Sequence, residues 1–139
     1  MGMFTRTTKG DRVIKSKRKA RCFINYLYRN YDVPRIPIYI HWHYRELINE
    51  AGKTSYGLFV YDDSPLIHVA GGKAKTTGVL SIIAHEFVHY LQYLHGRDMD
   101  DSEQIEKDAE HYGKGLFGLW LLGEKDCSWL KAWEPKEDA

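Results

Sequence analysis

The sequence contains no run of apolar residues close to the roughly 20 that a membrane-spanning helix requires. Its first residues, MGMFTRTTKGDR, lack the apolar core of a secretory signal peptide. These two absences predict an intracellular, cytoplasmic protein with no membrane partner. Cysteine is also scarce, because Cys22 and Cys127 are the two in the chain. They are too few and too isolated for a disulfide framework or a zinc knuckle, so we expect buried or idle thiols.

What is present indicates one globular domain with an unevenly charged surface. The 139 residues are 43% hydrophobic, which is enough for a modest core. Residues 1–21 hold eight Lys or Arg and one acidic residue, for a local charge of +7. The whole chain carries +1, so the remainder carries −6. This asymmetry predicts a nucleic-acid or acidic partner for residues 6–21, although a solvated helix face explains the same charges. We expect residues 1–15 to form a basic flexible arm and residues 16–139 a single domain.

Spacing and turn residues predict an α+β fold. Apolar residues at helical spacing predict a helix from Ser16 to about Tyr31. A β-branched and aromatic run predicts a strand at 38–42. Two further strands are expected at 55–61 and 66–70, joined as a hairpin by a turn of about four residues.

Helices are expected in the rest of the chain. Residues 44–51 are predicted to form a short helix, and two longer helices are predicted at 77–95 and from about 101 to 122. The polar loop 96–102 lets the last helix fold back antiparallel to the one before it. The expected architecture is a small three-stranded sheet packed on the N-terminal helix and these two helices. Whether its strands run in mixed directions is left open.

The helix at 77–95 carries an H-E-x-x-H motif at His85, Glu86 and His89. Its apolar residues fall on one stripe, which comprises Leu80, Ile83, Phe87, Leu91 and Leu94. The two histidines are one turn apart on the opposite face, where two imidazoles can bind one metal ion. Glu86 lies beside them and can reach a water bound to that metal. A solvated helix face in a chain with seven histidines is the alternative explanation.

A catalytic zinc usually takes three protein ligands, and four residues compete for the third place. We favour Glu106, because it lies on the shoulder of the apolar face of the last helix and points at the motif helix. Glu110 is one turn further on and is either the ligand or the acceptor for the outer N–H of a liganding histidine. His95 lies about 120° from His89 on an unbroken helix. His111 has a helical position toward solvent.

The motif residues His85, Glu86 and His89, followed by Glu106-Lys107-Asp108-Ala109-Glu110, resemble the gluzincin zinc metallopeptidases. The second stretch fits that family's E-x-x-A-x pattern. The resemblance is to gluzincins reduced to their catalytic core, as in the minigluzincins, and the chain is also similar to antirepressor-cleaving metallopeptidases of mobile elements. It covers roughly residues 36–120.

Two other metallopeptidase patterns are matched in part. The spacing of His85, His89 and His95 resembles that of the metzincins, which need a glycine where this chain has Gln92. His111 would suit a three-histidine site that resembles the SprT-like kind.

The gluzincin resemblance implies that a substrate lies antiparallel to an edge strand above the motif helix. Here that strand would comprise Leu66, Ile67, His68, Val69 and Ala70. The gluzincin subdomain that follows the core is expected to be absent, because nineteen residues remain after position 120. The identity of the side chain that stabilises the transition state is therefore an open question, and the candidates are His68, Tyr90, His111 and Tyr112.

The motifs favour hydrolysis of a peptide bond in a protein or peptide substrate, with residues 16–139 as a metallopeptidase-like catalytic domain. His85, His89 and Glu106 would hold one Zn²⁺ per chain, with Glu86 as the general base for the metal-activated water. One alternative is a DNA-associated metalloprotease that uses the basic arm. Another is a non-catalytic zinc-binding or adaptor protein. A latent protease, blocked by the arm or by residues 126–133, is a further hypothesis.

Overall fold

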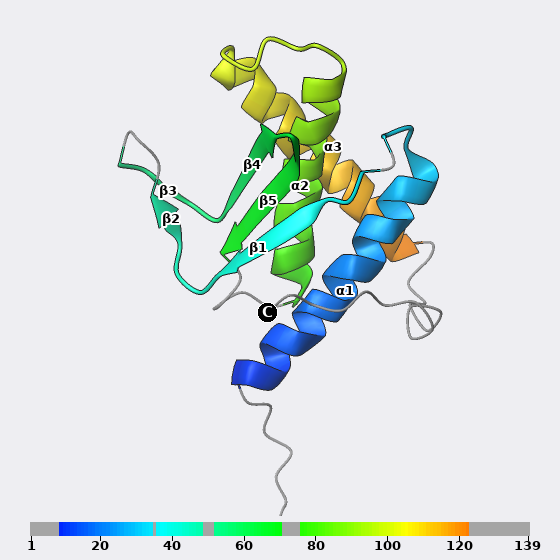
Figure 1. The fold of residues 1–139 in the computed structure, drawn as a ribbon, viewed down its shortest axis with the longest axis vertical. Helices are drawn as coiled ribbons and strands as arrows, with labels where there is room; N and C mark the ends of the chain where they lie inside the picture. Colours follow the sequence, from blue (N-terminus) through cyan, green and yellow to red (C-terminus); the bar gives the residue numbers. More distant parts are fainter. Residues whose placement is uncertain (1–8, 35, 49–51, 71–75, 123–139) are drawn as a thin grey trace, which may run out of the picture.

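The computed structural model describes residues 9–34, 36–48, 52–70 and 76–122, which form three helices and two small sheets (Figure 1). In chain order the elements are α1 (Lys9–Asn30), β1 (Tyr39–His43), β2 (Leu47–Ile48), β3 (Thr54–Ser55), β4 (Gly57–Asp62), β5 (Ser64–Ala70), α2 (Thr76–Leu94) and α3 (Ser102–Leu122). The predicted α+β architecture is confirmed. Among the described residues, no helix combines the length and apolar character needed to cross a membrane.

The main sheet has the strand order β1-β5-β4 and is mixed in direction. In the parallel pair Ile40 of β1 lies opposite Ile67 of β5, and in the antiparallel pair Phe59 of β4 lies opposite the same residue. β5 is therefore the central strand. The expectation that Leu66–Ala70 is an edge strand is wrong, because ladders on both sides already use its backbone hydrogen-bonding groups.

One face of this sheet packs on the helices. Ile67 and Val69 of β5 are fully buried in the core, together with Ile83 and Phe87 of α2. On α1, Phe23 contacts Trp120 of α3 at 5.2 Å between ring centroids. Residues alternate between the two faces of a strand, so His68 lies on the face away from the helices. The core thus fixes which face of the sheet each polar side chain occupies.

One helix cap and one close contact position α3 against α2. Gly96 adopts a φ of 72°, its N–H bonds Tyr93 O, and the Arg97 N–H bonds Gln92 O. This is a Schellman cap, which ends α2 and reverses the chain. Along α3, a Cβ built on Gly113 would lie 3.1 Å from His85 Cα. The two helices can therefore approach closely where the motif lies.

Four local expectations differ from the structure. α1 begins at Lys9, so residues 9–15 are helical, whereas we expected an irregular arm and a cap at Ser16. The hairpin turn is tighter than predicted, because Asp62 already pairs with Ser64 across Asp63, whose φ is 65°. The other two concern residues 44–48 and Cys22.

Residues 44–48 are not helical. Leu47 and Ile48 instead pair with β3, because so short a helix is marginal without a packed face. Cys22 is buried, as one of the two expectations held, but it is disulfide-bonded, so the expectation of a free thiol is wrong. The predictions for residues 1–8 and 126–133 lie outside the described residues.

Candidate metal centre

The motif histidines of α2 meet a carboxylate of α3. His85 Nε2 lies 2.9 Å from Glu106 Oε1, and His89 Nε2 lies 3.1 Å from Glu106 Oε2. The two imidazole rings lie 4.9 Å apart between centroids. The structure thus brings together the three side chains that the sequence analysis favoured as ligands. Glu106 is 57% exposed, so this cluster opens to solvent on the α3 side.

Gln92 determines which nitrogen of His89 carries a proton. Its side-chain nitrogen donates to Ile105 O at 3.0 Å, so its oxygen faces Nδ1 of His89 at 2.8 Å. An amide oxygen only accepts, so Nδ1 must donate its N–H. Burial is the main cause of a lowered His89 pKa, which favours the neutral ring. A neutral His89 therefore directs the lone pair of Nε2 away from Gln92.

That lone pair faces the carboxylate of Glu106. Two acceptors 3.1 Å apart with no proton between them repel each other, and a cation relieves this repulsion. Two imidazole nitrogens with a carboxylate oxygen form a donor set that zinc takes in catalytic sites. The ligand atoms of His85, Glu86 and His89 also lie within 4.8 Å of one another. The chemistry of the residues present fits a divalent metal ion.

Glu86 differs from Glu106 in its surroundings. Its side chain is 6% exposed, and burial followed by the charge of Glu106 raises its pKa to about 8. A Cβ built on Gly57 of β4 would lie 2.7 Å from Glu86 Oε2, so the carboxyl group lies directly against the strand. Glu86 is thus a buried, weakly acidic carboxyl group placed between the motif histidines and the sheet.

A cleft of about 220 Å³ opens at this position. It is lined by residues of β3, β4, α2 and α3, namely Ser55, Tyr56, Gly57, Ser81, Ile82, His85, Glu86 and Glu110. A larger cavity of about 390 Å³ lies elsewhere on α2 and α3, and its lining includes neither motif histidine, Glu86 nor Glu106. Of these two, the smaller cleft is the one that includes residues of the candidate centre, namely His85 and Glu86.

Two further side chains lie beside the motif histidines. Glu110 Oε2 lies 3.6 Å from His85 Nδ1, too far for a hydrogen bond, and its other oxygen lies 3.1 Å from Lys114 Nζ. Gln92 orients His89 through a hydrogen bond, and sequence reasoning missed this role. The signal was available, because Gln92 follows His89 at i+3 and so shares its helix face.

The remaining predicted candidates lie away from the cleft. His95 and Tyr112 line the larger cavity, and His111 is an exposed ring against Tyr112. Tyr90 is fully buried among the strands' aromatic rings. His68 lies on the opposite face of the sheet. Neither His68 nor Tyr112 lines the smaller cleft, and their role in stabilising a transition state stays a prediction.

Tyr56 lines the cleft and was not among the predicted residues. Its carbonyl oxygen accepts a hydrogen bond from the Ala70 N–H at 2.8 Å, which anchors its backbone to β5. Tyr56 directly precedes Gly57 in the sequence, but only the folded chain places it beside Glu86.

No family model matches this chain, and neither the curated proteins nor the solved structures contain a match.

Proposed function

We propose that this protein is a zinc-dependent peptidase whose centre lies between α2 and α3. The observation that carries the proposal is the convergence of His85 Nε2 and His89 Nε2 on one carboxylate, with the His89 tautomer fixed by Gln92. His85, His89 and Glu106 would hold the ion. When bound there, zinc supplies a water of lowered pKa and a positive charge that polarises a carbonyl group.

Glu86 is the proton carrier in this proposal. A general base works best when its pKa lies near the working pH, and burial raises the pKa of Glu86 toward that range. Its carboxylate would take a proton from the attacking water and pass it to the leaving amine. Glu106 suits the ligand role better than Glu86, because its two oxygens face both Nε2 atoms.

The edge of β4 supports a peptide as the substrate. Within the described part of the chain β4 pairs with β5 alone, so its other edge can accept an extended peptide as an added strand. Gly57 begins this strand and lies against Glu86. A peptide bound there would pass the cleft that Tyr56 lines, and the hydroxyl group of Tyr56 would stabilise developing negative charge.

Metal content and cleavage, measured on the same preparations, test the proposal. We expect wild-type protein to hold zinc and to cleave an unfolded protein substrate. Glu86→Gln should retain the zinc and lose the cleavage, whereas Glu106→Ala should lose both. Glu103→Ala is the matched control, because Glu103 lies on the same helix and is 84% exposed. Cleavage by Glu86→Gln, or zinc retained by Glu106→Ala, would contradict the assignment.

A non-catalytic zinc protein gives a different result in the same experiment. It predicts zinc that depends on Glu106, no cleavage by the wild type, and unfolding when a chelator removes the metal. The nucleic-acid partner expected through residues 6–21 stays a prediction.

A further inference from the structure

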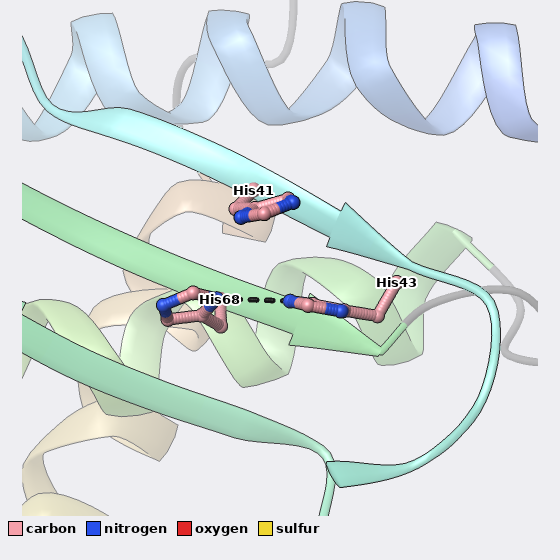
Figure 2. A group of neighbouring side chains, drawn as sticks. All are labelled: His41, His43 and His68. Carbon is pink, nitrogen blue, oxygen red and sulfur yellow. Dashed lines mark hydrogen bonds between the residues drawn. The ribbon is translucent and has the colours of Figure 1, made fainter.

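Three histidines form a second cluster on the face of the main sheet that points away from the helices (Figure 2). His41 and His43 come from β1, and His68 comes from β5. The parallel register places His41 directly opposite His68, and His43 is two residues further along the same face. Their neighbour Trp42 points to the helix-covered face of the sheet, as the position of Lys17 Nζ on α1, 5.8 Å from its ring centroid, shows.

The three rings are close enough to act together. His43 Nε2 lies 2.8 Å from His68 Nδ1, as the dashed line in Figure 2 marks. The ring of His41 lies 4.5 Å from that of His43 and 5.2 Å from that of His68, between centroids. One ring nitrogen from each residue lies within 4.8 Å of the others. Each strand therefore contributes imidazoles to one compact set of nitrogen donors.

We propose that His41, His43 and His68 bind one divalent transition-metal ion of the zinc type, at a site separate from the α2–α3 centre. Imidazole is a preferred ligand of such ions, and three imidazoles leave a fourth tetrahedral position open. Bond lengths of about 2.0–2.1 Å in a tetrahedron set neighbouring nitrogens roughly 3.3 Å apart. The His43–His68 pair must open by only about half an ångström to reach this distance.

The surroundings of the cluster suit a bound cation. His41 is exposed, while His43 and His68 are half-buried, so the open ligand position faces solvent. Burial and then the neighbouring histidines lower the pKa values of His43 and His68, which keeps their rings neutral. Neutral imidazole is the form that binds a metal. An ion here would tie β1 to β5, two strands far apart in the sequence.

Direct metal titration on the full chain tests this site without reference to activity. A His89→Ala, Glu106→Ala background removes the first centre, and Zn²⁺ and Co²⁺ alone are the probes. We expect this background to bind one equivalent of either ion, with a Co²⁺ absorption spectrum typical of tetrahedral nitrogen ligation. Added Zn²⁺ should also raise its melting temperature, because an ion that binds only the folded chain stabilises it.

Adding His68→Gln to that background should abolish binding, the spectrum and the thermal shift. His41→Gln is the second variant, because an exposed side chain can be replaced with little effect on folding. His95→Gln is the matched control, because His95 is an exposed histidine that lines the cavity on α2 and α3. A background protein that binds no ion, or a His41→Gln variant that binds as well as its parent, would overturn the proposal. Neither result depends on whether the α2–α3 centre is catalytic.

Discussion

The backbone of Gly57 lies against the side chain of Glu86, so closely that a Cβ at position 57 would come within 2.7 Å of Glu86 Oε2. The same Cβ would lie 2.6 Å from Ile82 Cγ2. Strands usually favour a larger residue than glycine, and at the first position of β4 the absence of a side chain has a local reason. It lets β4 cover the buried carboxyl group and keeps the cleft open.

The first prediction concerns this contact. We expect Gly57→Ala to displace the Glu86 carboxyl group and to lower turnover by at least tenfold, because small misplacements of a catalytic group cost rate steeply. Zinc content should stay unchanged, since no ligand moves. Gly115→Ala is the control, because no atom lies within 4 Å of a Cβ there. Equal turnover in the two variants would show that the Gly57 contact has no catalytic consequence.

The second prediction concerns the orientation of His89. Replacing Gln92 with Leu removes the acceptor for Nδ1–H and the side-chain N–H that donates to Ile105 O. We expect zinc affinity to fall by roughly 10–100-fold, the usual effect of losing a partner that orients a liganding imidazole. Competition against a chelator of known affinity measures this. Gln104→Leu is the control, since Gln104 bonds Asp108 on the exposed surface. Unchanged affinity in Gln92→Leu would exclude the orienting role.

The third prediction concerns the hydroxyl group of Tyr56. If it stabilises negative charge in the transition state, Tyr56→Phe should lower kcat by about 10²–10³-fold with little change in KM. Tyr39→Phe alters an exposed tyrosine on β1 and should have no effect. A raised KM at constant kcat would instead assign Tyr56 to substrate binding.

The fourth prediction is a pH dependence of the metal-free protein. Folding raises the pKa of Glu86 from 4.5 to about 8, chiefly through burial. Between these pH values the folded chain keeps a proton that the unfolded chain has lost, so stability falls as the pH rises. Glu86→Gln carries no titrating group at this position. It should therefore be more stable than the wild type near pH 8.

The two proteins should converge below about pH 4.5, where the wild-type carboxyl group is neutral in both states. Denaturant unfolding with a chelator present, at several pH values, measures the difference. Stability curves that stay parallel from pH 4.5 to 8 would contradict a buried, weakly acidic Glu86.

Much of the candidate site could be predicted because it depends on helical periodicity. The i and i+4 spacing of His85 and His89 places both rings on one face of a helix in any fold. Gly96 ends that helix through its φ of 72°, which glycine adopts at little cost. Once the chain reverses there, the helical position of Glu106 directs it at the motif helix. Each step joins residues that are near in sequence.

Other parts of the site depend on which strands become neighbours, and local patterns do not contain that information. Alternation along β5 places Ile67 and His68 on opposite faces, whichever strands lie beside it. Only pairing on both sides makes β5 central and leaves β4 as an edge strand beside Glu86. The parallel register of β1 and β5 likewise brings His41 and His43 to His68. The sequence by itself therefore determined the two long helices α2 and α3, the H-E-x-x-H motif and the direction of Glu106. The tertiary structure decided the cleft, the edge strand and the three-histidine cluster, because long-range strand pairing is selected by packing of the whole core.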